Sequence, residues 1–186
     1  MTAKAQAIAP GAGALRAPRA PRATPARQRA GSEAADAQEK VESVGASFID
    51  LYRAEPLARV ALVKEGLPAN YLDKLARRMN ITKDRLLPTL GIAPATVSRK
   101  LREAKPLSTD DSARALGMAR LIGQVEAMVQ ASGEPAGFDA AVWLARWLGE
   151  PLAALNGAPP ATLMDTAEGQ AMVSNLLARM QSGAYA

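Results

Sequence analysis

Apolar residues recur at helical spacing through most of the chain after residue 40. Val41, Val44, Phe48, Leu51 and Tyr52 follow at intervals of three, four, three and one residues, which places them on one face of a helix. No run of alternating Val, Ile or Thr residues is bounded by hairpin turns, so no strand is expected. The hydrophobic pattern therefore predicts an all-α fold.

Prolines and glycines mark the ends of the next predicted helices. Pro56 can end the first helix and occupy the first turn of a second, which carries Val60 and Val63. Gly66 supplies a left-handed cap for this second helix, and Pro68 prevents its continuation. The pattern then predicts a third helix over 69–79, with three residues facing inward: Tyr71, Leu72 and Leu75.

The segment ITKDRLLPTLGIAPATVSRKLREAK, residues 81–105, has the layout of two short helices joined by a tight turn. Thr82 can cap the first helix, Gly91 supplies the turn, and Pro94 suits the first turn of the second helix. Val97 and Leu101, four residues apart, are predicted to face inward. This layout is that of a helix-turn-helix, whose second helix enters the major groove of DNA. The predicted DNA contacts are the polar and basic residues of that helix: Thr96, Ser98, Arg99, Lys100 and Arg102.

Two observations bear on that prediction in opposite directions. Pro88 lies inside the first helix, where it removes a backbone donor and can kink the element, so a packed helical hairpin with a solvated basic face stays an alternative. Residues 64–106, however, carry ten basic and four acidic side chains, a net charge of +6, whereas residues 107–186 carry four basic and eight acidic, a net charge of −4. A basic centre and an acidic C-terminal part favour two different partners, the first of them nucleic acid.

A long helix is predicted over residues 107–132. Ser108 can cap it, and Asp110 and Asp111 favour the positive end of its dipole. A helix of this length can bridge two lobes, pair with its copy in a dimer, or pack into the core. Its predicted apolar stripe comprises Met118, Leu121, Ile122, Val125, Met128 and Val129.

Residues 133–186 predict a small helical C-terminal domain. Asp139 can cap a helix, with Phe138 and Trp143 at hydrophobic-staple positions. Trp143 shares one face with Trp147, and this pair forms either the core of the domain or an anchor for a partner. The pair Asn156-Gly157 is typical of a turn that accepts positive φ.

The last predicted helix has two candidate caps, Asp165, paired with Glu168 as in a capping box, and Thr166. Gly183 closes this helix and leaves residues 184–186 beyond it. The apolar stripe of the helix consists of Val173, Leu176, Leu177 and Met180.

Composition excludes several classes of function. The chain contains no Cys and no His, so disulfides, thiol nucleophiles, Cys/His zinc sites and Ser-His-Asp triads are absent. No carboxylate pair stands out beside a Gly-rich loop, so we expect no catalytic residue, cofactor or metal site. Residues 1–39 are rich in Arg and Pro, without apolar periodicity, and predict a disordered tail. No apolar run is long enough to span a membrane, and a cytoplasmic location is expected.

The C-terminal segment FDAAVWLARWLGEPLAALNGAPPATLMDTAEGQAMVSNLLARMQSGAYA, together with the LSTDDSAR start of the long helix, resembles the Xre/MbcA/ParS-type antitoxins. Their toxin-binding domain typically has a tryptophan-leucine helix, a leucine-asparagine-glycine turn, a proline-leucine patch, an acid-threonine-acid-glycine cap and a final helix ending in glycine. The resemblance extends from about Leu67 to the end. The matching residues are Trp143, Leu144, Leu155, Asn156, Gly157, Pro159, Leu163, Asp165, Thr166, Gly169, Leu176, Leu177 and Gly183.

The resemblance implies an antitoxin of a type II module, encoded beside a RES-domain toxin that depletes NAD+. Such an antitoxin dimerises, occludes the toxin's active-site cleft with its C-terminal domain, and represses its own operon through the helix-turn-helix. Two alternatives remain: a stand-alone helix-turn-helix regulator whose C-terminal lobe only dimerises, and a helical interaction protein that binds no DNA. The implied toxin contacts are Trp143, Trp147, Asn156, Gly157, Leu163, Arg179, Gln181, Ser182, Gly183 and Tyr185.

Overall fold

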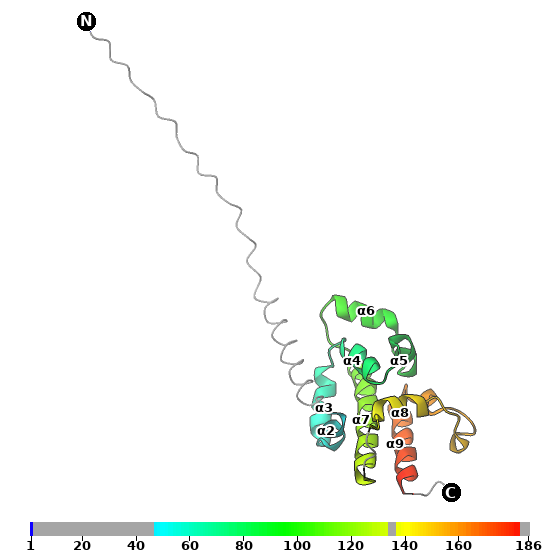
Figure 1. Ribbon diagram of the computed structural model, residues 1–186. Helices are drawn as coiled ribbons and strands as arrows, with labels where there is room; N and C mark the ends of the chain where they lie inside the picture. Colours follow the sequence, from blue (N-terminus) through cyan, green and yellow to red (C-terminus); the bar gives the residue numbers. More distant parts are fainter. Residues whose placement is uncertain (2–46, 134–136, 183–186) are drawn as a thin grey trace.

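The computed structural model describes Met1, residues 47–133 and residues 137–182 (Figure 1). The predicted disorder over 1–39 and the predicted helical positions Val41 and Val44 fall, apart from Met1, outside the described residues. Every regular element in these ranges is a helix, so the all-α prediction is confirmed. The elements are α2 (Phe48–Arg53), α3 (Pro56–Glu65), α4 (Tyr71–Arg78), α5 (Lys83–Thr89), α6 (Pro94–Arg102), α7 (Thr109–Ala131), α8 (Ala140–Trp147), the 3-10 turns η1 (Ala153–Leu155) and η2 (Pro160–Leu163), and α9 (Ala167–Gln181).

Helix α7 is the central element of the fold. Helices α2 and α3 lie on one side of it, α8 and α9 lie on the other, and α4 to α6 lie at one end (Figure 1). Gly123 allows α2 to approach closely, because a Cβ at this position would lie 1.9 Å from the carbonyl oxygen of Phe48. Most of the α7 stripe, Met118, Leu121, Ile122 and Val125, is at most 2% exposed. The stripe therefore packs within the chain, and it is not free to pair with a second copy.

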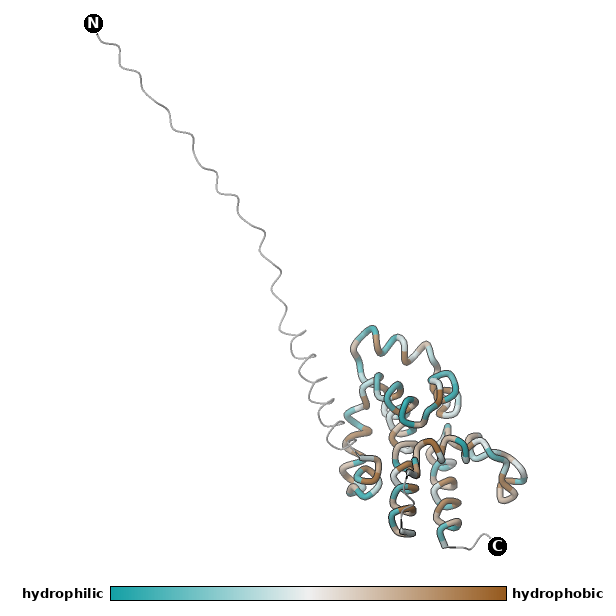
Figure 2. The backbone as a smooth tube through the Cα atoms, in the orientation of Figure 1, coloured by the Kyte–Doolittle hydropathy of each residue, from teal (hydrophilic) through white to brown (hydrophobic). Residues whose placement is uncertain are grey.

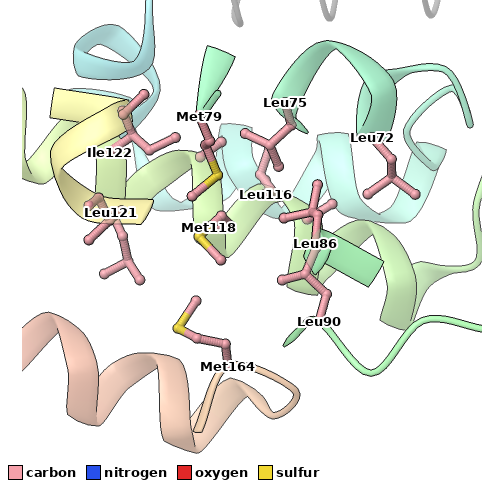
Figure 3. Close-up of a cluster of buried hydrophobic side chains, with 14 of the residues drawn as sticks. Leu72, Leu75, Met79, Leu86, Leu90, Leu116, Met118, Leu121, Ile122 and Met164 are labelled. Carbon is pink, nitrogen blue, oxygen red and sulfur yellow. The ribbon is translucent and has the colours of Figure 1, made fainter. Parts of the chain in front are cut away.

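One hydrophobic core joins the helix-turn-helix segment to the C-terminal segment. Met164, which follows η2, points towards Met118 of α7 (Figure 3), and Leu90 after α5 belongs to the same buried cluster. All three side chains are fully buried. Along α9 the colour changes from hydrophobic to hydrophilic every few residues, as expected for a helix packed on one face (Figure 2). The two segments are consequently parts of one packed body.

Several predicted helix ends are confirmed. Gly66 ends α3 with φ 89°, and Gly91 forms the turn after α5 with φ 62°. The Ser108 hydroxyl caps α7 by accepting a hydrogen bond from the Asp111 amide at 3.1 Å. Of the two candidate caps of α9, Thr166 is the one used, because its hydroxyl accepts from the Gly169 amide at 3.0 Å.

Three side-chain predictions are wrong. Thr82 occupies the N-cap position of α5 but forms no capping hydrogen bond. Tyr52 was expected on the inward face of α2 and is 37% exposed, because it lies at the edge of the contact between α2 and α7, with its Cβ beside Gly123 of α7 and part of its side chain in solvent. Leu101 was expected to face inward and is 40% exposed, although Val97, four residues earlier on the same helical face, is buried.

Candidate functional site

Helix α6 is held to the body mainly by its flanking turns. Val97 is its only buried residue, and no side chain caps its first turn. At its C-terminal side, Ala104 adopts φ 50°, a left-handed conformation that is unfavourable for a residue with a Cβ. Leu107 then donates its amide to the Leu67 carbonyl at 2.8 Å and ties the α6–α7 connection to the loop after α3. Six of the nine residues of α6 are exposed, so most of its surface is available for contact.

The turn between α5 and α6 is held in position by Arg114, which belongs to neither helix but to α7. Its guanidinium donates to the Gly91 carbonyl at 3.0 Å and to the Asp111 carboxylate at 2.6 Å. The positive φ of Gly91 suits glycine, and a Cβ there would lie 3.0 Å from both Arg114 and the Asp165 Cβ. Arg114 thus sets the position of the helix-turn-helix turn against α7 and against the loop that leads into α9.

Pro88 does not break the helix-turn-helix. It lies in the last turn of α5, where the missing amide deprives only the carbonyl of Asp84, an exposed residue of the first turn. The helix still ends normally, since the Leu90 amide donates to the Leu86 carbonyl at 3.1 Å. The two-helix arrangement that the sequence predicted is therefore present.

The five predicted DNA contacts all lie on α6 but differ in exposure. Ser98, Arg99 and Arg102 are exposed, whereas Thr96 and Lys100 are half-buried. The local potential is positive: the pKa of Glu103 is lowered by a hydrogen bond from Lys105 and also by the charges of Lys105, Arg99 and Lys100. An exposed helix with this potential can accept phosphate groups, and Arg and Ser side chains can bond to base edges.

The aromatic side chains of the C-terminal domain form a row from the surface to the core. The Phe138 and Trp143 rings lie 6.2 Å apart, which confirms the predicted staple, and Trp143 stacks on Trp147 at 5.8 Å with an interplanar angle of 11°. Phe138 is 38% exposed, Trp143 is half-buried and Trp147 is buried. The structure thus places Trp147 in the core, and of the two tryptophans only Trp143 reaches the surface.

The loop between α8 and α9 presents the other predicted partner contacts. Asn156 and Gly157 both have positive φ, 56° and 84°, as predicted for this turn, and both are exposed. Leu163 is half-buried at the end of η2. Arg179, Gln181 and Ser182 are exposed at the far end of α9. Gly183 and Tyr185 lie outside the described residues.

Two buried glutamines join α9 to α7. The Gln170 side-chain amide donates to the Arg114 carbonyl at 3.1 Å and to the Met164 carbonyl at 2.9 Å. Gly117 makes room for it, because a Cβ there would lie 1.7 Å from the Gln170 Oε1. The Gln124 amide donates to the Ser174 carbonyl at 2.9 Å and its Oε1 accepts from the Ser174 hydroxyl at 2.7 Å. These bonds fix the register of α9 on α7, since a shifted helix would leave buried polar groups unpaired.

Sequence reasoning missed Arg114 and both glutamines. A signal was present for Gln170, which lies three residues before Val173 and seven before Leu177 and so belongs to the buried face of α9. Within the described ranges, no group of three or more acidic side chains could hold a metal ion. None of the helices in these ranges combines the length and hydropathy that a membrane span requires.

Comparison with known proteins identifies both parts of the chain. The antitoxin Xre-like helix-turn-helix domain matches residues 58–120, and the antitoxin Xre/MbcA/ParS C-terminal toxin-binding domain matches residues 136–183. The chain is 47% identical over 136 residues to the Prs ADP-ribosylating antitoxin of Sphingobium sp. strain YBL2, covering 73% of this chain and 86% of that protein.

Two further relatives are less similar in sequence. The antitoxin Xre of Photorhabdus laumondii is 25% identical over 123 residues, 66% of this chain and 78% of its own length. The antitoxin Xre of Pseudomonas putida is 24% identical over 124 residues, 65% of this chain and 69% of its own length. The chain therefore belongs to the Xre/MbcA/ParS family of type II antitoxins, with a helix-turn-helix domain followed by a C-terminal toxin-binding domain.

Proposed function

We propose that the chain neutralises a RES-domain toxin that consumes NAD+, by occluding the active-site cleft of that toxin with its C-terminal domain. The 47% identical relative carries the name Prs ADP-ribosylating antitoxin, and an ADP-ribosyl group is transferred from NAD+. The match of residues 136–183 to the toxin-binding domain is the observation that carries the proposal. Family membership also favours this function over a stand-alone regulator whose C-terminal lobe only dimerises.

The proposed toxin contacts form two groups on the C-terminal domain. The first is the α8 side, where Trp143 is the accessible aromatic anchor and Trp147 supports it from the core. The second comprises the exposed turn and the end of α9. Because the Gln170 and Gln124 bonds fix α9, the toxin would meet a preformed surface and little ordering entropy would be lost on binding. The proposed contacts are Trp143, Asn156, Gly157, Leu163, Arg179, Gln181, Ser182, Gly183 and Tyr185, and the buried Trp147 acts through Trp143.

We propose that the chain also represses its own operon as a homodimer, each α6 reading one half-site. Arg99 and Arg102 would contact guanine edges or phosphates, Ser98 would contact either, and Thr96 and Lys100 would support the approach. A dimer presents two such helices, which matches the two-fold symmetry of common operators. Both partners, toxin and operator, would place the chain in the cytoplasm.

The toxin proposal is tested by purifying the full chain with the protein encoded by the adjacent gene and following NAD+ loss. We expect the toxin alone to consume NAD+ and equimolar chain to stop the loss. A parallel assay for ADP-ribose attached to Prs, the word that the name of the 47% identical relative contains, distinguishes NAD+ hydrolysis from transfer to a protein. Undiminished NAD+ consumption in the presence of excess chain would contradict the proposal.

The operator proposal is tested with the double variant Arg99→Ala/Arg102→Ala. We expect weaker binding to the promoter DNA of the operon and a smaller salt dependence, because fewer phosphate counterions are released. Arg53→Ala is the control, because it removes an exposed positive charge that is not on α6. Arg53 lies on α2 and donates to Gln130 in the last turn of α7. An equal loss of DNA affinity in both variants would indicate an effect of net charge alone and would contradict base or phosphate contact by α6.

A further inference from the structure

Two arginines come together where α3 packs on α7. Arg59 is half-buried and lies three residues before the buried Leu62, so it belongs to the inward face of α3. Its Nη1 donates to the Tyr52 carbonyl oxygen at 3.3 Å and to the Ala54 carbonyl oxygen, both at the C-terminal end of α2. These bonds hold the guanidinium of Arg59 beside the end of α2.

Arg120 reaches the same place from α7. The Tyr52 Cβ lies 2.9 Å from the position that a Cβ would take at Gly123, and Arg120 precedes Gly123 by about one turn of α7. Burial, and after it the positive charge of Arg59, lowers the pKa of the Arg120 guanidinium, whereas Tyr52 raises it. Because both arginines are half-buried, water screens the repulsion between their like charges only in part.

Within residues 47–133 and 137–182, no acidic side chain forms an ion pair with either arginine. Glu55 precedes Arg59 by four residues, the spacing of a helical ion pair, yet these two side chains do not form one. Arg114, which is also half-buried, holds the Asp111 carboxylate at 2.6 Å and shows the usual arrangement. The carbonyls at the end of α2 account for the position of Arg59, but they do not account for a second arginine beside it.

An anion with two negative charges would compensate both guanidinium groups. A phosphate group carries about −1.5 to −2 charges at pH 7 and has three oxygens that accept the paired N–H donors of arginine. A carboxylate carries one charge and would leave the other guanidinium uncompensated. We propose that Arg59 and Arg120 bind the phosphate group of a small molecule between α3 and α7. This site shares no residue with the proposed DNA and toxin contacts.

Thermal unfolding of the full chain with inorganic phosphate tests the site. We expect about 20 mM phosphate to raise the unfolding midpoint by roughly 4 to 7 °C relative to sodium chloride of equal ionic strength, as mass action gives for a dissociation constant of about 1 mM. Arg120→Gln should lose this shift and, without phosphate, should unfold no earlier than the natural chain. Arg77→Gln is the matched control, because Arg77 is an exposed arginine of α4, and it should keep the shift. No shift in the natural chain, or an equal shift in Arg120→Gln, would overturn the proposal.

Phosphorus NMR of the full chain distinguishes free phosphate from phosphate on an organic group. The signals of inorganic phosphate and of AMP should both broaden with the natural chain, and neither should broaden with Arg120→Gln. Tyr52 is 37% exposed beside the two guanidinium groups and can stack on a base, so AMP binding at least about 3-fold tighter than phosphate, and lost in Tyr52→Ala, would assign a nucleotide-like ligand. Equal affinity for the two probes would assign inorganic phosphate. Broadening of neither signal, or the same broadening with Arg120→Gln, would contradict the site.

Discussion

Helices α6 and α9 carry the two proposed functions and are held in opposite ways. Helix α6 buries a single residue, Val97, and has no side-chain cap. Helix α9 buries five residues, is capped by Thr166 and is joined to α7 through Gln170 and through Ser174. The first helix is positioned by its flanking turns, and the second is positioned along its whole face.

This difference suits the two proposed partners. A helix with one buried side chain opens locally at a low cost in free energy, and it can adjust its docking on a DNA groove. An inhibitor that fills a cleft gains affinity when its surface is already ordered before binding. The fold thus combines an adjustable reading helix with a rigid inhibitory helix on one core.

The largest expected effect is that of Gly169→Ala at the start of α9. A Cβ there would lie 1.9 Å from the Leu163 carbonyl oxygen, a backbone atom that cannot move without displacing η2. We expect a loss of about 3 kcal/mol in the free energy of unfolding by urea. Gly149→Ala is the control, because its nearest contacts are 3.2 and 3.4 Å away, and it should change stability by less than about 0.5 kcal/mol. Similar losses of unfolding free energy in both variants would show that the close contact between Gly169 and the Leu163 carbonyl is not the cause.

The second prediction compares two buried valines. Val97→Ala truncates the one buried side chain of α6. It should weaken the packing of α6 on the rest of the protein by about 2 kcal/mol. Hydrogen exchange should then accelerate in α6 amides and remain slow in α9. Val173→Ala, equally buried in α9, should instead accelerate exchange across α7 and α9. If Val97→Ala exposed the amides of α9 to the same extent, α6 would not be an independent unit.

A smaller effect is expected for Gln170→Leu. Leucine has a similar volume but removes the donor that serves the Arg114 and Met164 carbonyls. The free energy of unfolding should fall by about 1–2 kcal/mol. Gln181→Leu, on the exposed end of the same helix, should leave unfolding unchanged. Equal stability of the natural chain and Gln170→Leu would mean that the buried amide contributes nothing to the register of α9.

The smallest prediction has the opposite sign and concerns the end of α6. Ala104→Gly should raise the free energy of unfolding by about 1 kcal/mol, because glycine adopts the φ of 50° without steric strain. Ala95→Gly, in the exposed first turn of α6, should lower it by about 0.5–1 kcal/mol. Thermal or urea unfolding of the two variants measures both changes in the free energy of unfolding. A lower stability of Ala104→Gly would show that Ala104 is not strained in its left-handed conformation.

Local rules in the sequence predicted much of the fold and less of the site. The caps at Gly66 and Ser108 and the turns at Gly91 and Asn156 depend on the conformational preferences of single residues, so they were predictable. Which of Asp165 and Thr166 caps α9 depends on geometry that the spacing does not contain.

Non-local packing explains what sequence reasoning missed. The exposure of Leu101 depends on how α6 packs on the other helices, and periodicity within one helix does not report that packing. The bond from Gln170 to the Arg114 carbonyl joins residues 56 apart in sequence, and the pattern of α9 alone does not predict this partner. The aromatic row, by contrast, was partly predictable, because Phe138 and Trp143 stand at staple spacing on one helix end.

Hydrogen exchange of the full chain, alone, with operator DNA and with toxin, tests the proposed division between the two helices most directly. Operator should slow exchange in α6 and in the turn at Gly91, while α9 remains as in the free chain. Toxin should slow exchange in α8, the turn at Asn156 and the end of α9, without protecting α6. Protection of α6 by toxin together with an unchanged C-terminal domain would contradict the assignment of the two functions.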